Sequence, residues 1–180
     1  MDLSGLGGAL LEVNLQEGHT AAVTALFRDA PAGAEILLVV RQVRDGDPWS
    51  GQVALPGGRA RPGERPSETA AREMLEEVGI DLRDCATVLG CLPLIAPANK
   101  PEMAVVPQVA VLTRDVPAVC GEEVTAAHWV PFHALTANEV RVVRHLHGDD
   151  REFPAFAHGH LEVWGLTHRI LTELRSLLPE

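Results

Sequence analysis

Residues 57–82 read GGRARPGERPSETAAREMLEEVGIDL, and this stretch is the most informative part of the sequence about fold and function. A glycine pair is followed by a loop containing Pro62 and Gly63, and then by a segment with helical periodicity that runs to about Val78. Ser67 suits the N-cap of this helix and Gly79 suits its C-cap. The stretch therefore predicts a loop that leads into a capped helix.

This helix gathers acidic side chains on one side. At about 100° per residue, Glu73, Glu76 and Glu77 fall within an arc of roughly 100°. The opposite, apolar side carries Ala71, Met74, Leu75 and Val78. Like charges three or four residues apart destabilise a helix by about 0.2–0.5 kcal/mol per pair, and only Arg72 offsets this. A solvated acidic face is the alternative, but such faces usually mix signs, so the convergence favours a site for a hard divalent cation such as Mg²⁺.

Length and composition describe a globular chain. The 180 residues, 46% hydrophobic and 22% charged, suit one domain spanning residues 1–180. Residues 1–18 are an N-terminal extension whose packing the sequence does not determine. No run approaches the ~20 apolar residues of a membrane span, and the acidic Asp2 and Glu12 do not suit an export signal. We therefore expect a cytoplasmic protein without a membrane partner.

Charge limits the class of partner. The net charge of −10 argues against nucleic acid, whose binding needs a basic surface. A phosphate-bearing small molecule would need bound metal to supply positive charge. The three cysteines, Cys85, Cys91 and Cys120, form no CxxC pair, so we expect small buried residues rather than a disulfide framework or a zinc knuckle. A homodimer is compatible with the sequence, which does not determine the oligomeric state.

The remaining elements complete a mixed α/β pattern. Strands are predicted at residues 19–27, 35–40, 52–55, 87–95, 104–112, 128–130 and 160–164. Helical segments are predicted at residues 132–137, 139–147 and 165–178. Strands, a helix, more strands and a closing helix indicate one sheet covered by helices.

Fixed residues in this stretch resemble a known motif. Gly58, five residues, Glu64, seven residues and then REMLEEVGI at 72–80 resemble a complete Nudix box, with every fixed position filled. The resemblance implies a Nudix hydrolase with an α/β/α sandwich fold and a mixed β-sheet. It also implies a pyrophosphatase that cleaves a diphosphate linked to another moiety and uses Mg²⁺ or Mn²⁺.

The resemblance also implies roles for residues within the box. Glu73, Glu76 and Glu77 match the family's metal-binding glutamates, and the Gly58 carbonyl matches a backbone metal ligand. Glu76 and Glu77 are also expected to take part in catalysis through the metal. The helical wheel reaches the three glutamates independently, whereas the role of Gly58 comes from the resemblance alone.

Three further residues are candidates for catalysis. Arg72 matches the arginine that orients the glutamates, and Glu64 matches a supporting carboxylate. Family members often place another glutamate ahead of a late strand, as a metal ligand or general base. Glu122 and Glu123 precede the predicted strand at 128–130, and Glu123 is our choice, against the alternative of a solvated loop acid.

Arginines flank the box and are candidates for binding phosphates. They are Arg41, Arg44, Arg59 and Arg61. Arg41 ends a buried strand that points toward the box, and together with Arg59 it is our expected substrate-binding pair. The alternative is that these are solvated loop arginines.

A finer resemblance concerns the substrate. LLVVR at 37–41, GQVALPGG at 51–58 and VWGLTHRIL at 163–171 are similar to segments of coenzyme A pyrophosphatases. Leu55 stands where that subgroup usually has Phe, Gln42 stands where Ser or Ala is usual, and a downstream arginine is out of register. Hydrolysis of coenzyme A or a derivative is our first hypothesis. Hydrolysis of ADP-ribose, dinucleotides or nucleoside triphosphates is the second, and a non-catalytic nucleotide-binding module is the third.

Overall fold

The centre of the protein is a seven-stranded mixed sheet. The computed structural model describes residues 6, 8–15, 18–46, 49–146 and 148–178. The strands are β1 (Ala21–Arg28), β2 (Glu35–Arg41), β3 (Val53–Ala54), β4 (Gly57–Arg59), β5 (Ala86–Cys91), β6 (Val105–Leu112) and β7 (Val124–Pro131). Their order is β3-β2-β1-β6-β5, with β4 paired to β1 and β7 paired to β2. Only the β1–β6 pair is parallel among the described strands of this sheet.

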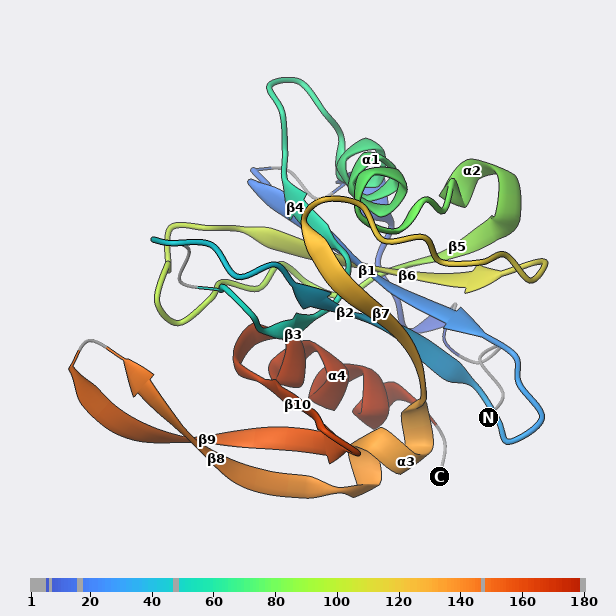
Figure 1. Ribbon diagram of the computed structural model, residues 1–180. Helices are drawn as coiled ribbons and strands as arrows, with labels where there is room; N and C mark the ends of the chain where they lie inside the picture. The colour runs from blue at the N-terminus through green and yellow to red at the C-terminus, as the bar shows by residue number, and fades with distance from the viewer. Residues whose placement is uncertain (1–5, 7, 16–17, 47–48, 147, 179–180) are drawn as a thin grey trace.

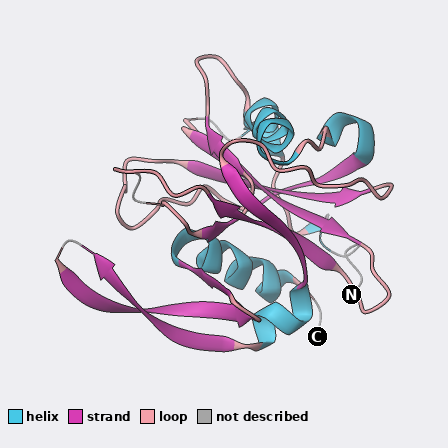
Figure 2. Cartoon of the chain, in the orientation of Figure 1, coloured by secondary structure: helices cyan, strands magenta, loops and turns pink. Residues whose placement is uncertain are grey.

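Helices cover both faces of this sheet (Figure 1). They are α1 (Pro66–Val78), α2 (Leu82–Cys85), α3 (Phe132–Ala137) and α4 (Gly165–Leu177), and a short 3-10 turn spans Val13–Leu15. Helices α1 and α2 lie on one side and α4 on the other, as Figure 2 also shows. A second sheet of β8 (Glu139–Leu146), β9 (Asp149–His158) and β10 (Leu161–Trp164) lies on the α4 side. The predicted α/β/α sandwich with a mixed sheet is confirmed.

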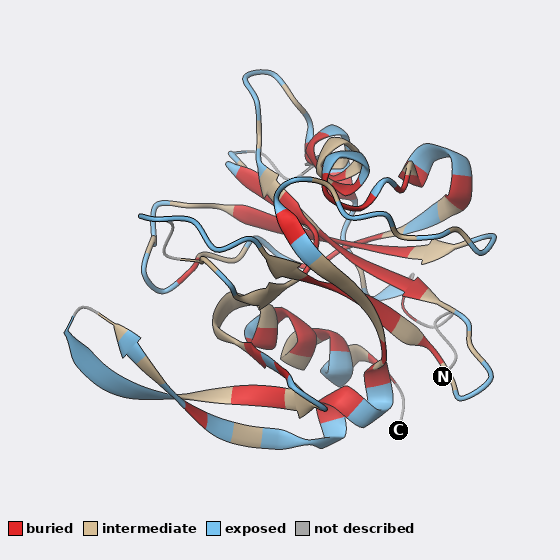
Figure 3. Cartoon of the chain, in the orientation of Figure 1, coloured by how far each residue is buried: buried red, intermediate tan, exposed pale blue. Residues whose placement is uncertain are grey.

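Alternation along the central strands creates the two cores. In β1, Leu26 packs with the α1 side and Phe27 packs with the α4 side. In β2, Leu37 and Leu38 divide in the same way. Because successive side chains of a strand point to opposite faces, one strand buried on both sides supports both helical layers. Figure 3 shows these strands as buried between exposed outer surfaces.

Helix α1 begins one residue before the predicted N-cap. Arg65 is the N-cap and Pro66 is the first helical residue, where its missing N–H costs nothing. Glu68 Oε2 accepts a hydrogen bond from the Arg65 N–H at 2.8 Å. Ser67 as the N-cap was therefore wrong, and its hydroxyl instead contacts Asn14. Gly79 is confirmed as the C-cap, with φ of 69° and its N–H bonded to the Leu75 carbonyl.

The predicted helix at 139–147 was wrong. Residues Glu139–Leu146 form β8, which pairs antiparallel with β9 along its length; residue 147 lies outside the described residues. Val140 and Val142 flank the exposed Arg141 as a strand would, but the exposed Val143 breaks the apolar–polar alternation, so the pattern alone did not distinguish a strand from a helix. The strand β9 was missed because its first half is exposed and polar.

The other predicted strands are present with shifted ends, and β7 extends beyond the predicted 128–130. The described part of the N-terminal extension, residues 1–18, joins the edge of the sheet at β5. There Leu11 and Cys91 exchange two backbone hydrogen bonds of 2.9 Å. Cys85 and Cys91 are buried as expected, whereas Cys120 is exposed. None of the helices in the described part of the chain has the length and apolar composition that crossing a bilayer requires.

The side of α1 that packs on the sheet should contribute most of what the helix adds to stability. Met74 is fully buried, whereas Leu75, which the wheel placed on the same apolar side, is 46% exposed. We expect Met74→Ala to lower the free energy of unfolding by about 2–5 kcal/mol. Leu75→Ala should change it by about 0.5 kcal/mol or less. Urea unfolding measures both, and equal losses for the two variants would contradict this packing.

Candidate active site

Glu77 is the most buried carboxylate of α1. Its side chain is 2% exposed, and its Oε2 accepts a hydrogen bond of 2.9 Å from the Gly57 N–H. Arg41 Nη1 lies 3.8 Å from the other oxygen. Burial raises the pKa of Glu77 from 4.5 to about 7, although the Gly57 N–H and the Arg41 charge both favour the ionised form. The helix thus keeps a carboxyl group that titrates near neutral pH beside the glycine pair.

Arg72 connects the other carboxylates of the site. It binds Glu64 in a bidentate manner, from Nε at 2.7 Å and from Nη2 at 2.9 Å. Its Nη1 donates to Glu73 at 2.7 Å and to Glu76 at 3.1 Å, while Nη2 also reaches the Arg59 carbonyl. The hydrogen bonds from Arg72 lower the pKa of Glu64 to about 2, and the pKa of Arg72 itself is raised. One guanidinium therefore holds three carboxylates in place.

Two glycines bring β4 against the helix and against β1. A Cβ on Gly58 would lie 2.5 Å from the carboxyl group of Glu73. Gly57 has φ of 149°, and a Cβ there would overlap the backbone of Ala22. Glycine is the residue that tolerates such a positive φ and close approach. The β4 backbone therefore lies directly beside two of the three helix glutamates.

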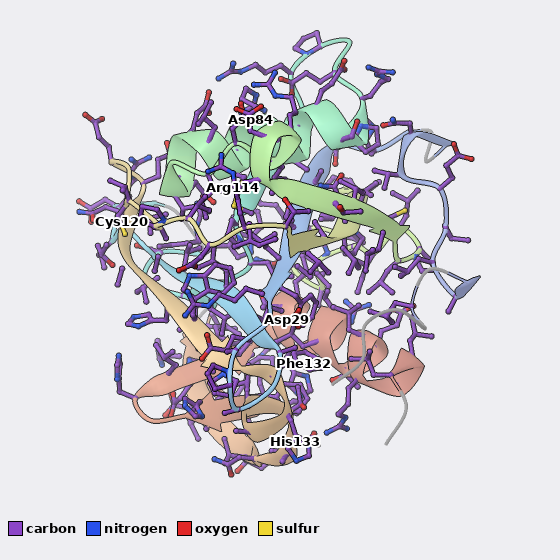
Figure 4. All side chains as sticks on the ribbon, turned by 90° about the vertical axis from the view of Figure 1, so that its right-hand side faces the viewer. Asp29, Asp84, Arg114, Cys120, Phe132 and His133 are labelled. Carbon is purple, nitrogen blue, oxygen red and sulfur yellow. The ribbon has the colours of Figure 1, made fainter. Side chains whose placement is uncertain are left out.

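The loop before β7 is a further part of the site. It is attached to the end of α1, because the Gly121 N–H donates to the Glu77 carbonyl at 2.8 Å and the Val119 N–H donates to the Val78 carbonyl at 2.9 Å. A Cβ on Gly121 would overlap the Glu76 carbonyl oxygen. The attachment carries Glu123 to the site, where Arg44 Nη1 binds it at 3.1 Å. Figure 4 shows Cys120 in this loop, close to the helical layer.

Helix α1, the glycine pair and this loop border an open, polar cavity of about 440 Å³. It is lined by Arg59, Arg61, Arg72, Glu73, Glu76, Glu77, Glu122 and Glu123. Most of the predicted site residues thus meet here, with Glu64 held by Arg72 and Arg41 reaching Glu77. Sequence reasoning missed Gly121, whose one signal was its place directly before the two acidic residues.

The donor set fits a hard divalent cation. Glu73, Glu76 and Glu77 could supply oxygen ligands from one helix, and the Glu73 carboxyl group occupies the space that a Cβ on Gly58 would need. Oxygen ligands are the type that Mg²⁺ and Mn²⁺ prefer. Within the described ranges, no three acidic, His or Cys side chains form a ready cluster for a metal. Here the carboxylates of Glu73 and Glu76 are turned toward Arg72.

The fold and the cavity define a class of protein: a mixed sheet between helices, with an acidic cleft where one helix meets a glycine turn. A family model described as the NUDIX domain matches residues 18–149. The chain belongs to the Nudix family. The predicted resemblance is confirmed at this level.

Solved structures agree on the fold. A Nudix hydrolase of M. smegmatis, RenU, is 24% identical with a TM-score of 0.55, covering 66% of this chain and 74% of its own. A binary complex of a C. elegans Ap4A hydrolase is 23% identical with a TM-score of 0.52, covering 63% of this chain and 80% of its own. Among curated sequences, an uncharacterized protein of Schizosaccharomyces pombe is 57% identical over 49 residues. That match covers 27% of this chain and 15% of the yeast protein.

Substitutions of the two glycines should have different effects, one on ion binding and the other on stability. In Gly58→Ala the new Cβ meets the flexible end of Glu73, so we expect the fold to persist and Mn²⁺ affinity to fall by about tenfold or more. In Gly57→Ala the Cβ meets the β1 backbone at a strained φ, and we expect a loss of about 1–3 kcal/mol or more in the free energy of unfolding. Urea unfolding and Mn²⁺ titration distinguish the two. The reverse assignment of effects would contradict this geometry.

Glu77 should make stability depend on pH in an unusual direction. Its pKa is raised to about 7 in the folded protein, so between pH 4.5 and 7 the folded state holds a proton that the unfolded state has lost. Stability from this group is present below that window and is lost as the pH rises through it. In the presence of EDTA, we expect Glu77→Gln to gain stability relative to wild type between pH 5 and pH 8, on the order of 2–3 kcal/mol. A constant difference between the variants would refute this.

Proposed function

We propose that this protein hydrolyses the diphosphate linkage of a nucleoside diphosphate-linked compound with Mg²⁺ or Mn²⁺. The observation that carries the proposal is the cavity in which three helix glutamates, an orienting arginine and further arginines converge. Five glutamates from α1 and the loop before β7 line this cavity and would repel a diphosphate unless a cation were bound among them. A pyrophosphohydrolase with a bound divalent ion reconciles an acidic cleft with an anionic substrate.

The chain's residues take defined roles in this proposal. Glu73, Glu76, Glu77 and the Gly58 carbonyl would hold the metal, which supplies positive charge to the phosphates and acidifies water. Arg72 orients Glu73 and Glu76, and Glu64 in turn fixes Arg72 through two hydrogen bonds. These contacts leave the carboxylates few alternative orientations.

Groups outside α1 would bind the substrate and handle its proton. Glu123 is proposed as the base that accepts a proton from the attacking water, because it lines the cavity from the loop before β7 and is held there by Arg44. Arg59 lines the cavity, and Arg41 lies beside Glu77, so both are proposed to contact phosphate oxygens. Guanidinium groups suit this role because they bind phosphate in a planar, bidentate manner.

Coenzyme A or a derivative is the first proposed substrate. The support is the sequence similarity at 37–41, 51–58 and 163–171, together with the position of the first two segments. The first runs along β2 to Arg41 beside Glu77, and the second runs through β3 to the glycine pair. The departure at Leu55 lies within the second segment, and the departure at Gln42 directly follows the first. ADP-ribose, dinucleotides and nucleoside triphosphates are therefore the alternative substrates, and a non-catalytic nucleotide-binding module is the remaining reading.

A panel of diphosphate compounds tests the proposal. We expect coenzyme A with Mg²⁺ to give 3′,5′-ADP and 4′-phosphopantetheine, identified by mass. Preferred turnover of another compound on the panel would move the substrate to the alternative class. No turnover of any compound with either Mg²⁺ or Mn²⁺ would refute the enzymatic proposal.

A further inference from the structure

Arg61 stands out among the arginines of the cavity. Its Nη2 donates to Glu76 Oε1 at 3.0 Å, and its side chain is 61% exposed. Its backbone, in contrast, is fixed, because its N–H donates to Glu64 Oε2 at 2.8 Å. The same Glu64 oxygen also accepts from Arg72 and Thr69. Arg61 is thus a solvent-exposed guanidinium on an anchored backbone, at the rim of the cavity.

Glu76, the partner of Arg61, could bind either an arginine or a divalent cation. Glu76 is the most exposed of the three helix glutamates, at 48%, and it accepts from both Arg61 and Arg72. A divalent cation would use the same carboxylate oxygens that these arginines occupy. Arg72 has Glu64 and Glu73 as further partners, whereas Glu76 is the described ion-pair partner of the Arg61 side chain. Arg61 is therefore the arginine whose charge would be left unneutralised when Glu76 binds a cation.

Building on the proposed function, we propose that Arg61 exchanges partners. It pairs with Glu76 in the arrangement seen here, and it pairs with a phosphate oxygen of the diphosphate substrate when Glu76 serves the cation. Arg61 lines the same cavity as Glu73, Glu76 and Glu77. Its side chain could therefore change partner within the cavity while its backbone stays in place. A guanidinium released from one carboxylate is suited to bind a phosphate anion in the same place.

The exchange predicts opposite effects on two affinities. In Arg61→Gln, the cation competes for Glu76 with the Arg72 guanidinium but no longer with that of Arg61. We therefore expect Mn²⁺ to bind about two- to fivefold more tightly, the range of an exposed ion pair. The substrate loses a charge-assisted contact. We therefore expect methylenediphosphonate, a diphosphate analogue that resists hydrolysis, to bind the Mn²⁺-loaded protein about tenfold more weakly. Arg61→Lys, which keeps the charge, should keep the Mn²⁺ affinity near that of wild type.

The chain offers a matched control. Arg65 binds Glu68 at 2.8 Å, and these two side chains are 63% and 47% exposed, close to the values for Arg61 and Glu76. Arg65 does not line the cavity. We expect Arg65→Gln to leave both affinities unchanged, so a general effect of removing one surface charge would appear in both variants.

The experiment measures free Mn²⁺ by electron paramagnetic resonance and methylenediphosphonate binding by calorimetry, for wild type and the three variants. Tighter Mn²⁺ binding together with weaker diphosphonate binding in Arg61→Gln alone supports the exchange. Tighter Mn²⁺ binding with unchanged diphosphonate binding would make Arg61 a counterion only and overturn it. Unchanged or weaker Mn²⁺ binding would overturn it as well. Because neither measurement needs turnover, a wild-type protein that binds both probes but hydrolyses no compound would contradict the proposed function and not this inference.

Discussion

The arrangement of the carboxylates in the site depends on the ion pairs that the guanidinium of Arg72 makes. It binds Glu64, Glu73 and Glu76 at once, and it is itself mostly buried. Without it, Glu73 and Glu76 would be like charges three residues apart on one helix, which is destabilising. Because Arg72 holds them through short hydrogen bonds, the helix can keep them on the cavity side. A cation bound here would have to share Glu73 and Glu76 with the Arg72 guanidinium.

The position of α1 follows from contacts at both of its ends. Its first turn is closed by Arg65 and Glu68, and its last turn is bonded by the loop that contains Gly121. Between these ends, Met74 fixes the helix on the sheet, and the Gly57 N–H binds Glu77. Burial disfavours the ionised form of Glu77, which lines the cavity. Buried carboxyl groups with a raised pKa are common at functional sites.

The sequence predicted the centre of the site better than its surroundings. Helical periodicity placed Glu73, Glu76 and Glu77 together because that pattern is local to one element. It could not show that Glu77 is buried, since burial depends on Gly57 from another strand. For the same reason Leu75 was assigned to the packed side, although no element covers it fully.

The errors elsewhere have similar causes. The segment predicted as a helix was short and carried no strong helical or strand signal, and pairing with β9 makes Glu139–Leu146 a strand. Gly121 could not be recognised because its role is to approach the Glu76 carbonyl, a contact between residues far apart in the sequence. The fold class was predictable because the order of elements and the motif both determine it, whereas these contacts arise only from tertiary packing.

The proposed activity requires that the acidic face of α1 acts in catalysis rather than in folding. Two exposed glutamates of this helix distinguish these two roles. Glu76 lines the cavity and Glu68 does not, although their side chains are 48% and 47% exposed. Turnover of the preferred diphosphate compound should be measured for Glu76→Gln and Glu68→Gln, with unfolding followed in parallel. If this catalytic role is right, we expect Glu76→Gln to lose turnover by about 100-fold or more with the fold retained, and Glu68→Gln to keep near wild-type turnover. Wild-type turnover by Glu76→Gln would contradict it.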